Sequence, residues 1–102
     1  MVAKIDIPAE KIAEFCEKWK IREFSFFGSV LGDSFGPDSD VDVLVSFLPE
    51  SQWDLFDLSD MRDELAEMFH RPVDLVEKEA LRNPIRRRHI LNGREVVYAR
   101  EG

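Results

Sequence analysis

The spacing of apolar residues along the chain predicts two amphipathic helices. In residues 7–20 and 51–70, apolar side chains recur at intervals of three and four, which places them on one face of a helix. The face of the first helix comprises Ile12, Phe15, Cys16 and Trp19. The face of the second helix, which starts near Asp54, comprises Leu55, Leu58, Met61, Leu65, Met68 and Phe69. Aspartate and glutamate occupy the other side of the second helix, so we expect that side to face solvent.

End signals, rather than periodicity, predict a third helix. Asn83 suits the N-cap, Pro84 suits the first helical position, and Gly93 suits the position just after the helix. Pro8 suits the first turn of the first helix for the same reason as Pro84, because its fixed φ is already helical.

Three further segments have the β-branched and aromatic composition of strands. They are residues 22–28, 40–47 and 72–77, and a last short strand is expected at residues 95–99. The order is therefore α-β-β-α-β-α with a terminal strand. We expect an α/β (α+β) fold in one domain of residues 1–102, with a small mixed sheet of three or four strands flanked by helices.

Composition and charge narrow the classes of function. Hydrophobic residues make up 44% of the chain, enough for a modest core. The net charge of −7 repels phosphate backbones, so direct nucleic-acid binding is not expected, although a metal ion can join acidic groups to a nucleotide. No apolar run approaches a membrane span or a signal peptide, so we expect a cytoplasmic protein. Cys16 is interpreted as a small apolar helix residue, with a reactive thiol as the alternative.

Two acidic residues lie in the segment that otherwise has the composition of a buried strand. Side chains alternate along a strand, so Asp40 and Asp42 should point to one face, opposite the valines between and after them. Two close carboxylates repel each other unless a cation compensates, and oxygen ligands favour Mg²⁺, Mn²⁺ or Ca²⁺. Asp74 has a similar setting in residues 72–77, and it joins the pair if the two strands are neighbours.

Plainer interpretations of these acids stay open. A single aspartate near a strand end is usually a cap or turn residue, which is our interpretation of Asp38 and an alternative both for Asp74 and for the pair Asp40 and Asp42. An EF-hand loop starting at Asp38 is excluded, because its sixth and twelfth positions would be Val43 and Pro49 rather than Gly and Glu.

The turn at Gly28 and Ser29 completes the candidate site. Glycine after a strand allows a ligand to approach the backbone closely. A helical turn beginning at Ser29 would direct free N–H groups toward a phosphate, with the hydroxyl as one more donor. We therefore expect a phosphate and a metal ion to share one site with Asp40 and Asp42.

This pattern resembles a known signature. Gly28-Ser29, ten residues, and then Asp40-Val41-Asp42 is similar to the motif of the DNA-polymerase-β-like nucleotidyltransferase superfamily. From Phe26 to about Tyr98 the chain resembles the minimal nucleotidyltransferase (MNT) branch, and in particular MntA-like antitoxins of HEPN–MNT toxin–antitoxin modules.

The resemblance implies a function and a role for each matching residue. Gly28 and Ser29 would bind the β- and γ-phosphates of ATP, Asp40 and Asp42 would bind Mg²⁺, and Asp74 would assist the metal and the attacking hydroxyl. The implied enzyme is a protein adenylyltransferase that moves AMP onto a tyrosine of a HEPN-domain ribonuclease toxin and releases pyrophosphate. Its implied partners are ATP and that toxin, in a hetero-oligomer.

The chain departs from the family pattern at two loop positions. Many relatives carry arginine where this chain has Gly32 and Gly36. The absence of these two positive charges would weaken ATP binding. A second hypothesis is therefore a catalytically weak subunit that neutralises its toxin by binding alone. Transfer of a nucleotide to a small molecule is a third, for which 102 residues leave little room.

A basic patch in the third helix could supply the missing positive charge. It comprises Arg82, Arg86, Arg87 and Arg88. The alternative is an ordinary solvated helix face, and His89 is interpreted as a packing or surface residue.

Overall fold

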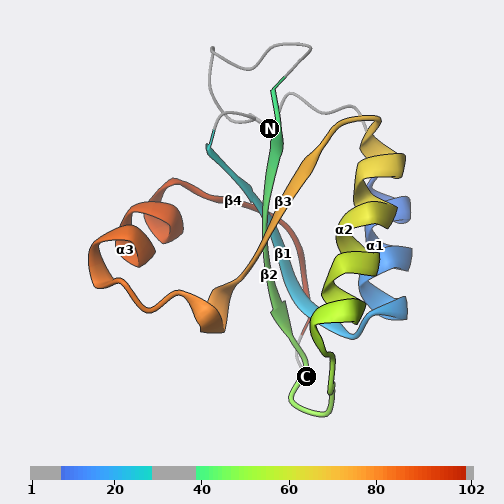
Figure 1. Cartoon of the computed structure of the whole chain (residues 1–102), viewed down its shortest axis with the longest axis horizontal. Coiled ribbons are helices and arrows are strands. Elements are labelled where there is room, and N and C mark those ends of the chain that lie inside the picture. Colours follow the sequence, from blue (N-terminus) through green and yellow to red (C-terminus); the bar gives the residue numbers. More distant parts are fainter. Residues whose placement is uncertain (1–7, 29–38, 101–102) are drawn as a thin grey trace.

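The computed structural model describes residues 8–28 and 39–100. Three α-helices, four strands and a short 3₁₀ helix follow one another along the described chain (Figure 1). In order they are α1 (Ala9–Lys18), β1 (Ile21–Phe27), β2 (Val41–Phe47), α2 (Leu55–Phe69), β3 (Val73–Glu77), η2 (Lys78–Ala80), α3 (Pro84–Gly93) and β4 (Glu95–Ala99). The predicted order of elements and the α/β class, with a small mixed sheet, are confirmed.

The sheet has the strand order β3-β2-β1-β4. β1 is antiparallel to both β2 and β4, whereas β2 and β3 are parallel and are joined by α2. Figure 1 shows α1 and α2 together on one side of the sheet and α3 on the other. This arrangement gives three layers, in which the sheet is covered unequally on its two faces.

The main hydrophobic core lies between the sheet and the pair α1 and α2. It consists of alternate residues of the strands and the apolar faces of the two helices. Its members are Ile12, Phe15, Cys16, Ile21, Phe24, Phe26, Val41, Val43, Val45, Met61, Leu65, Phe69 and Val73. Burial raises the pKa of the Cys16 thiol to about 12, assisted by the charge of Glu17, which agrees with a packing role rather than a reactive one.

A smaller core lies on the α3 face of the sheet. Phe27 of β1 and Leu44 of β2 point to this face and pack with Leu81 and with Ile90 of α3. Because the two apolar clusters lie on opposite faces, β2 is buried on both sides along most of its length.

The helix ends follow their sequence signals with two corrections. Asp54 caps α2 in a capping box with Asp57, and the Asn83 side chain accepts hydrogen bonds from the first turn of α3. Leu55, predicted to lie on the apolar face of α2, is instead 81% exposed, because this first helical residue borders an open hollow with Leu58 and Leu75 and does not pack into the core. Gly93, predicted to follow α3, is its last residue.

Within the described ranges, no helix has the length and apolar content that crossing a membrane requires.

Candidate active site

The acidic segment forms the predicted strand, with one correction at its start. β2 begins at Val41, so Asp40 is exposed and lies just before the strand rather than within it. Val41, Val43 and Val45 are at most 1% exposed in the main core. Alternation therefore directs the half-buried Asp42 to the opposite face, as predicted.

Asp74 lies beside Asp42 on the neighbouring strand. In the parallel ladder of β2 and β3, these two residues are direct register partners. Register partners on adjacent strands have Cα atoms roughly 4.8 Å apart and direct their side chains to the same face. The predicted adjacency of the two acidic strands is confirmed, and the shared face is the one that α3 covers.

Gly28 brings the main chain against the Asp42 carboxylate. Phe27 is the register partner of Asp42 on β1, and Gly28 follows it with φ +73°, in the left-handed region that favours glycine. A Cβ atom at this position would lie 3.2 Å from the carboxyl carbon of Asp42 and would overlap its Oδ2. Glycine is therefore the residue that fits here without displacing the carboxylate. Ser29, the other residue of the predicted phosphate turn, lies outside the described residues.

The carboxylates suit a divalent cation in their chemistry but do not enclose one by themselves. Within residues 8–28 and 39–100, no three histidine, cysteine, aspartate or glutamate side chains are grouped closely enough to hold a metal ion. Mg²⁺ commonly binds through one or two carboxylates and completes its shell with water and substrate phosphates. The Asp42–Asp74 pair fits such a site, in which the nucleotide supplies the remaining ligands.

A cavity of about 400 Å³ opens next to Gly28 and extends along α3. Its lining includes Phe27, Gly28, Arg86, His89, Ile90 and Gly93. The four α3 residues follow the helical spacing i, i+3, i+4 and i+7, so they form one stripe of that helix. The sequence indicated that the basic patch could supply charge to the candidate site, but not that Arg86 is the arginine that lines this cavity. Another hollow of about 410 Å³ is partly lined by Lys11 and Glu64, between α1 and α2 on the opposite face of the sheet from the acids.

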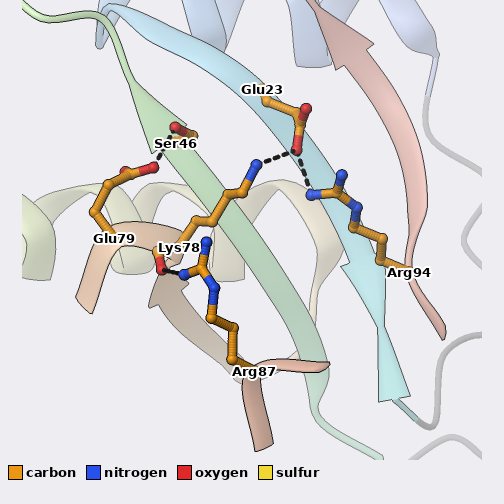
Figure 2. Close-up of polar contacts among 6 residues, drawn as sticks. All are labelled: Glu23, Ser46, Lys78, Glu79, Arg87 and Arg94. Carbon is orange, nitrogen blue, oxygen red and sulfur yellow. Dashed lines mark hydrogen bonds and ion pairs between the residues drawn. The ribbon is translucent and has the colours of Figure 1, made fainter. Parts of the chain in front are cut away.

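Polar contacts attach η2 and α3 to the far end of the same sheet face. Figure 2 shows the Glu23 carboxylate between two cations, with Arg94 Nη1 2.5 Å and Lys78 Nζ 3.8 Å from its Oε1. Arg87 Nη1 donates to the Lys78 carbonyl oxygen at 2.9 Å. These contacts fix the chain on both sides of α3, and so they set where the cavity-lining stripe lies relative to the acids.

A second link joins η2 to β2, the strand next to β1. The Ser46 hydroxyl donates to a Glu79 carboxylate oxygen at 2.8 Å, across from the Glu23 contacts (Figure 2). Because Ser46 is buried, this bond holds η2 close to β2.

The model of the nucleotidyltransferase domain family matches residues 9–97. The chain belongs to this family. The match includes every described element up to the middle of β4. The family prediction is thus confirmed, and with it the prediction that the protein is an enzyme of the nucleotidyltransferase class.

Relatives and solved structures narrow this assignment. The chain is 35% identical to the protein adenylyltransferase MntA of Thermococcus cleftensis over 85 residues, which are 83% of this chain and 81% of that one. Its fold matches a toxin–antitoxin crystal structure with AMP-PNP at a TM-score of 0.75 and 18% identity, covering 93% of this chain and 76% of that one. It also matches a complex of the tri-AMPylated Shewanella oneidensis HEPN toxin with its MNT antitoxin at a TM-score of 0.67 and 18% identity, covering 90% and 70%.

These likenesses confirm the predicted minimal nucleotidyltransferase fold. The individual roles of Gly28, Ser29, Asp40, Asp42 and Asp74 stay predictions, because the structure shows where the described ones lie but not what they bind.

Proposed function

We propose that this nucleotidyltransferase is a Mg²⁺-dependent protein adenylyltransferase that moves AMP from ATP to a hydroxyl of a HEPN-domain toxin, and so acts as an antitoxin. The observation that carries the proposal is the register of Asp42 with Asp74, directly beside the Gly28 backbone. Two carboxylates on one sheet face next to a close-approach glycine are suited to a metal-bound triphosphate.

Each site residue has a definite part in this proposal. Gly28 and Ser29 hold the β- and γ-phosphates. Asp40 and Asp42 hold the metal ion with Asp74 as a further ligand, and Mn²⁺ can substitute for Mg²⁺. When bound, the ion neutralises phosphate charge and favours ionisation of the acceptor hydroxyl. Asp74 accepts the proton of that hydroxyl, whose oxygen attacks the α-phosphorus. The bond from the α-phosphorus to pyrophosphate breaks, which gives an AMP ester and free pyrophosphate.

The acceptor in this proposal is a tyrosine of a partner protein. Asp40, Asp74 and Gly28 are all exposed, so this end of the sheet is accessible to a side chain from another molecule. The relatives described above include an antitoxin in complex with its AMPylated HEPN toxin. A net charge of −7 would also attract a basic ribonuclease toxin into a hetero-oligomer.

A second candidate function is inhibition of the toxin by binding alone. The observation in its favour is the sequence between Arg22 and Arg62, which contains the whole candidate site except Asp74 and has no lysine or arginine. A triphosphate carries several negative charges, and a loop and strand that supply no cationic side chain of their own would bind it weakly. The cations near this segment come from elsewhere in the chain, as with Arg71, whose guanidinium donates to the Ser39 carbonyl oxygen at 3.4 Å.

The two functions are separated by incubating the protein with labelled ATP, Mg²⁺ and the HEPN toxin encoded beside its gene. We expect label on a toxin tyrosine, and we expect Asp42→Asn to reduce the transfer at least 100-fold. Asp63→Asn is the matched control, because Asp63 is an exposed acid of α2 on the other side of the sheet. Protection from the toxin that survives Asp42→Asn, without any label transfer by the wild type, would favour inhibition by binding alone.

A further inference from the structure

The cavity between the end of β1 and α3 opens on the sheet face to which Asp42 points, and Gly28 is the lining residue that lies next to Asp42. Phe27 and Asp42 are register partners, so their side chains point to one face, and Phe27 packs there against Ile90 of α3. Gly28 lines the cavity, and a Cβ atom added to Gly28 would overlap the Asp42 carboxylate. Gly28 therefore lies next to both the Asp42 carboxylate and the cavity.

The three consecutive arginines of α3 have different surroundings. Arg87 is partly buried, and its guanidinium donates to the Lys78 carbonyl oxygen. Arg86 lines the cavity, one helical turn before His89 and Ile90. Arg88 is exposed and, being two residues from Arg86, points to a different side of the helix. Within residues 8–28 and 39–100, no salt bridge to an acidic side chain holds Arg86.

We propose that this cavity receives the phosphates of the nucleotide and that Arg86 is their cationic partner, with His89 as an additional N–H donor. The inference rests on the function proposed above and adds to it the source of positive charge. No lysine or arginine lies between Arg22 and Arg62, so positive charge must reach the site from elsewhere in the chain. Arg71 approaches the start of β2, where it donates to the Ser39 carbonyl oxygen, and Arg86 lines the cavity. A guanidinium can donate two parallel hydrogen bonds to phosphate oxygens, and the volume of about 400 Å³ suits part of a nucleotide.

The test is calorimetric binding of AMP-PNP, magnesium pyrophosphate and adenosine to the purified protein. We expect Arg86→Ala to weaken AMP-PNP and pyrophosphate binding by roughly 10- to 100-fold, the usual effect of losing a charge-assisted bond, and to leave adenosine binding within twofold. Arg86→Lys should lie between these limits, because lysine keeps the charge but loses the planar fork. Arg88→Ala is the matched control and should change no affinity by more than about twofold, since its charge is solvated and its side chain points to a different side of α3.

The outcomes separate this inference from the proposed function. Equal losses in Arg86→Ala and Arg88→Ala, or no loss in Arg86→Ala, overturn the inference alone. Wild-type protein that binds AMP-PNP through Arg86 but transfers no AMP to the toxin overturns the proposed function alone. Wild-type protein that binds neither AMP-PNP nor pyrophosphate overturns both. Because Arg86 is exposed, thermal unfolding of both alanine variants should match the wild type and show that α3 is intact.

Discussion

The sharpest structural prediction concerns Gly28→Ala, which adds one methyl group at the junction of β1 and the acidic pair. The backbone there has φ +73°, a conformation that costs an L-residue about 1–2 kcal/mol. The new Cβ would overlap Asp42 Oδ2, so the carboxylate must also move, and overpacking of this kind costs about 1–3 kcal/mol. Asp42 is only half-buried and can turn partly away, so we expect a total loss of about 2–3 kcal/mol in the free energy of unfolding.

Urea and thermal unfolding followed by circular dichroism would measure this loss, which corresponds to a fall in melting temperature of roughly 10–20 °C. Gly93→Ala is the matched control, because a Cβ there meets nothing within 4 Å and lies at the end of a helix. The control should be neutral or stabilising by up to about 1 kcal/mol. A Gly28→Ala variant as stable as the wild type, or a Gly93→Ala variant that is equally destabilised, would refute the reasoning. The displaced carboxylate should also abolish AMP transfer at temperatures where the Gly28→Ala variant is folded.

Three further predictions concern stability and titration. Glu23→Gln should lower the free energy of unfolding by about 1–3 kcal/mol, because two half-buried cations lose their shared carboxylate. Lys18→Gln, which breaks the more exposed pair with Glu64, should cost less than about 1 kcal/mol. Equal urea midpoints for the two variants would contradict this prediction. Cys16 should resist thiol reagents at pH 8 until urea unfolds the chain, and labelling of the native protein at the rate of a free thiol would show otherwise. Burial, and to a lesser extent the charge of Glu79, raises the pKa of Glu77, so the ionised carboxylate destabilises the fold above that pKa. Glu77→Gln should therefore be more stable than the wild type at pH 7, by less than about 1 kcal/mol. If the stability difference between the two proteins does not shrink as the pH falls through the raised pKa, the prediction is wrong.

Much of the fold follows from local pattern, because helix and strand periodicity are properties of neighbouring residues. The valine-aspartate alternation of β2 placed Val43 and Asp42 on opposite faces before any partner strand was known. The predicted start near Asp54 and the cap signal at Asn83 likewise placed the starts of α2 and α3. These features need only the backbone geometry of a few consecutive residues, so the sequence is sufficient for them.

The candidate site could not be completed in this way, because its parts meet through long-range pairing. The sequence offered Asp74 as a third acid, but only the parallel ladder of β2 and β3, reached by the crossover through α2, makes it the neighbour of Asp42. Gly28 was predicted to let a ligand approach the backbone, but its contact with the Asp42 carboxylate depends on the antiparallel register of β1 and β2.

The basic patch shows the same division between local and tertiary information. The sequence determined that α3 is basic, with three consecutive arginines that differ in no local property. Only the packing of α3 against the sheet, through the buried Ile90, places Arg86 in the cavity lining and leaves Arg88 outside it, exposed to solvent. A helix turns by about 100° at each residue, so adjacent identical residues acquire different surroundings once one side of the helix is fixed against a sheet.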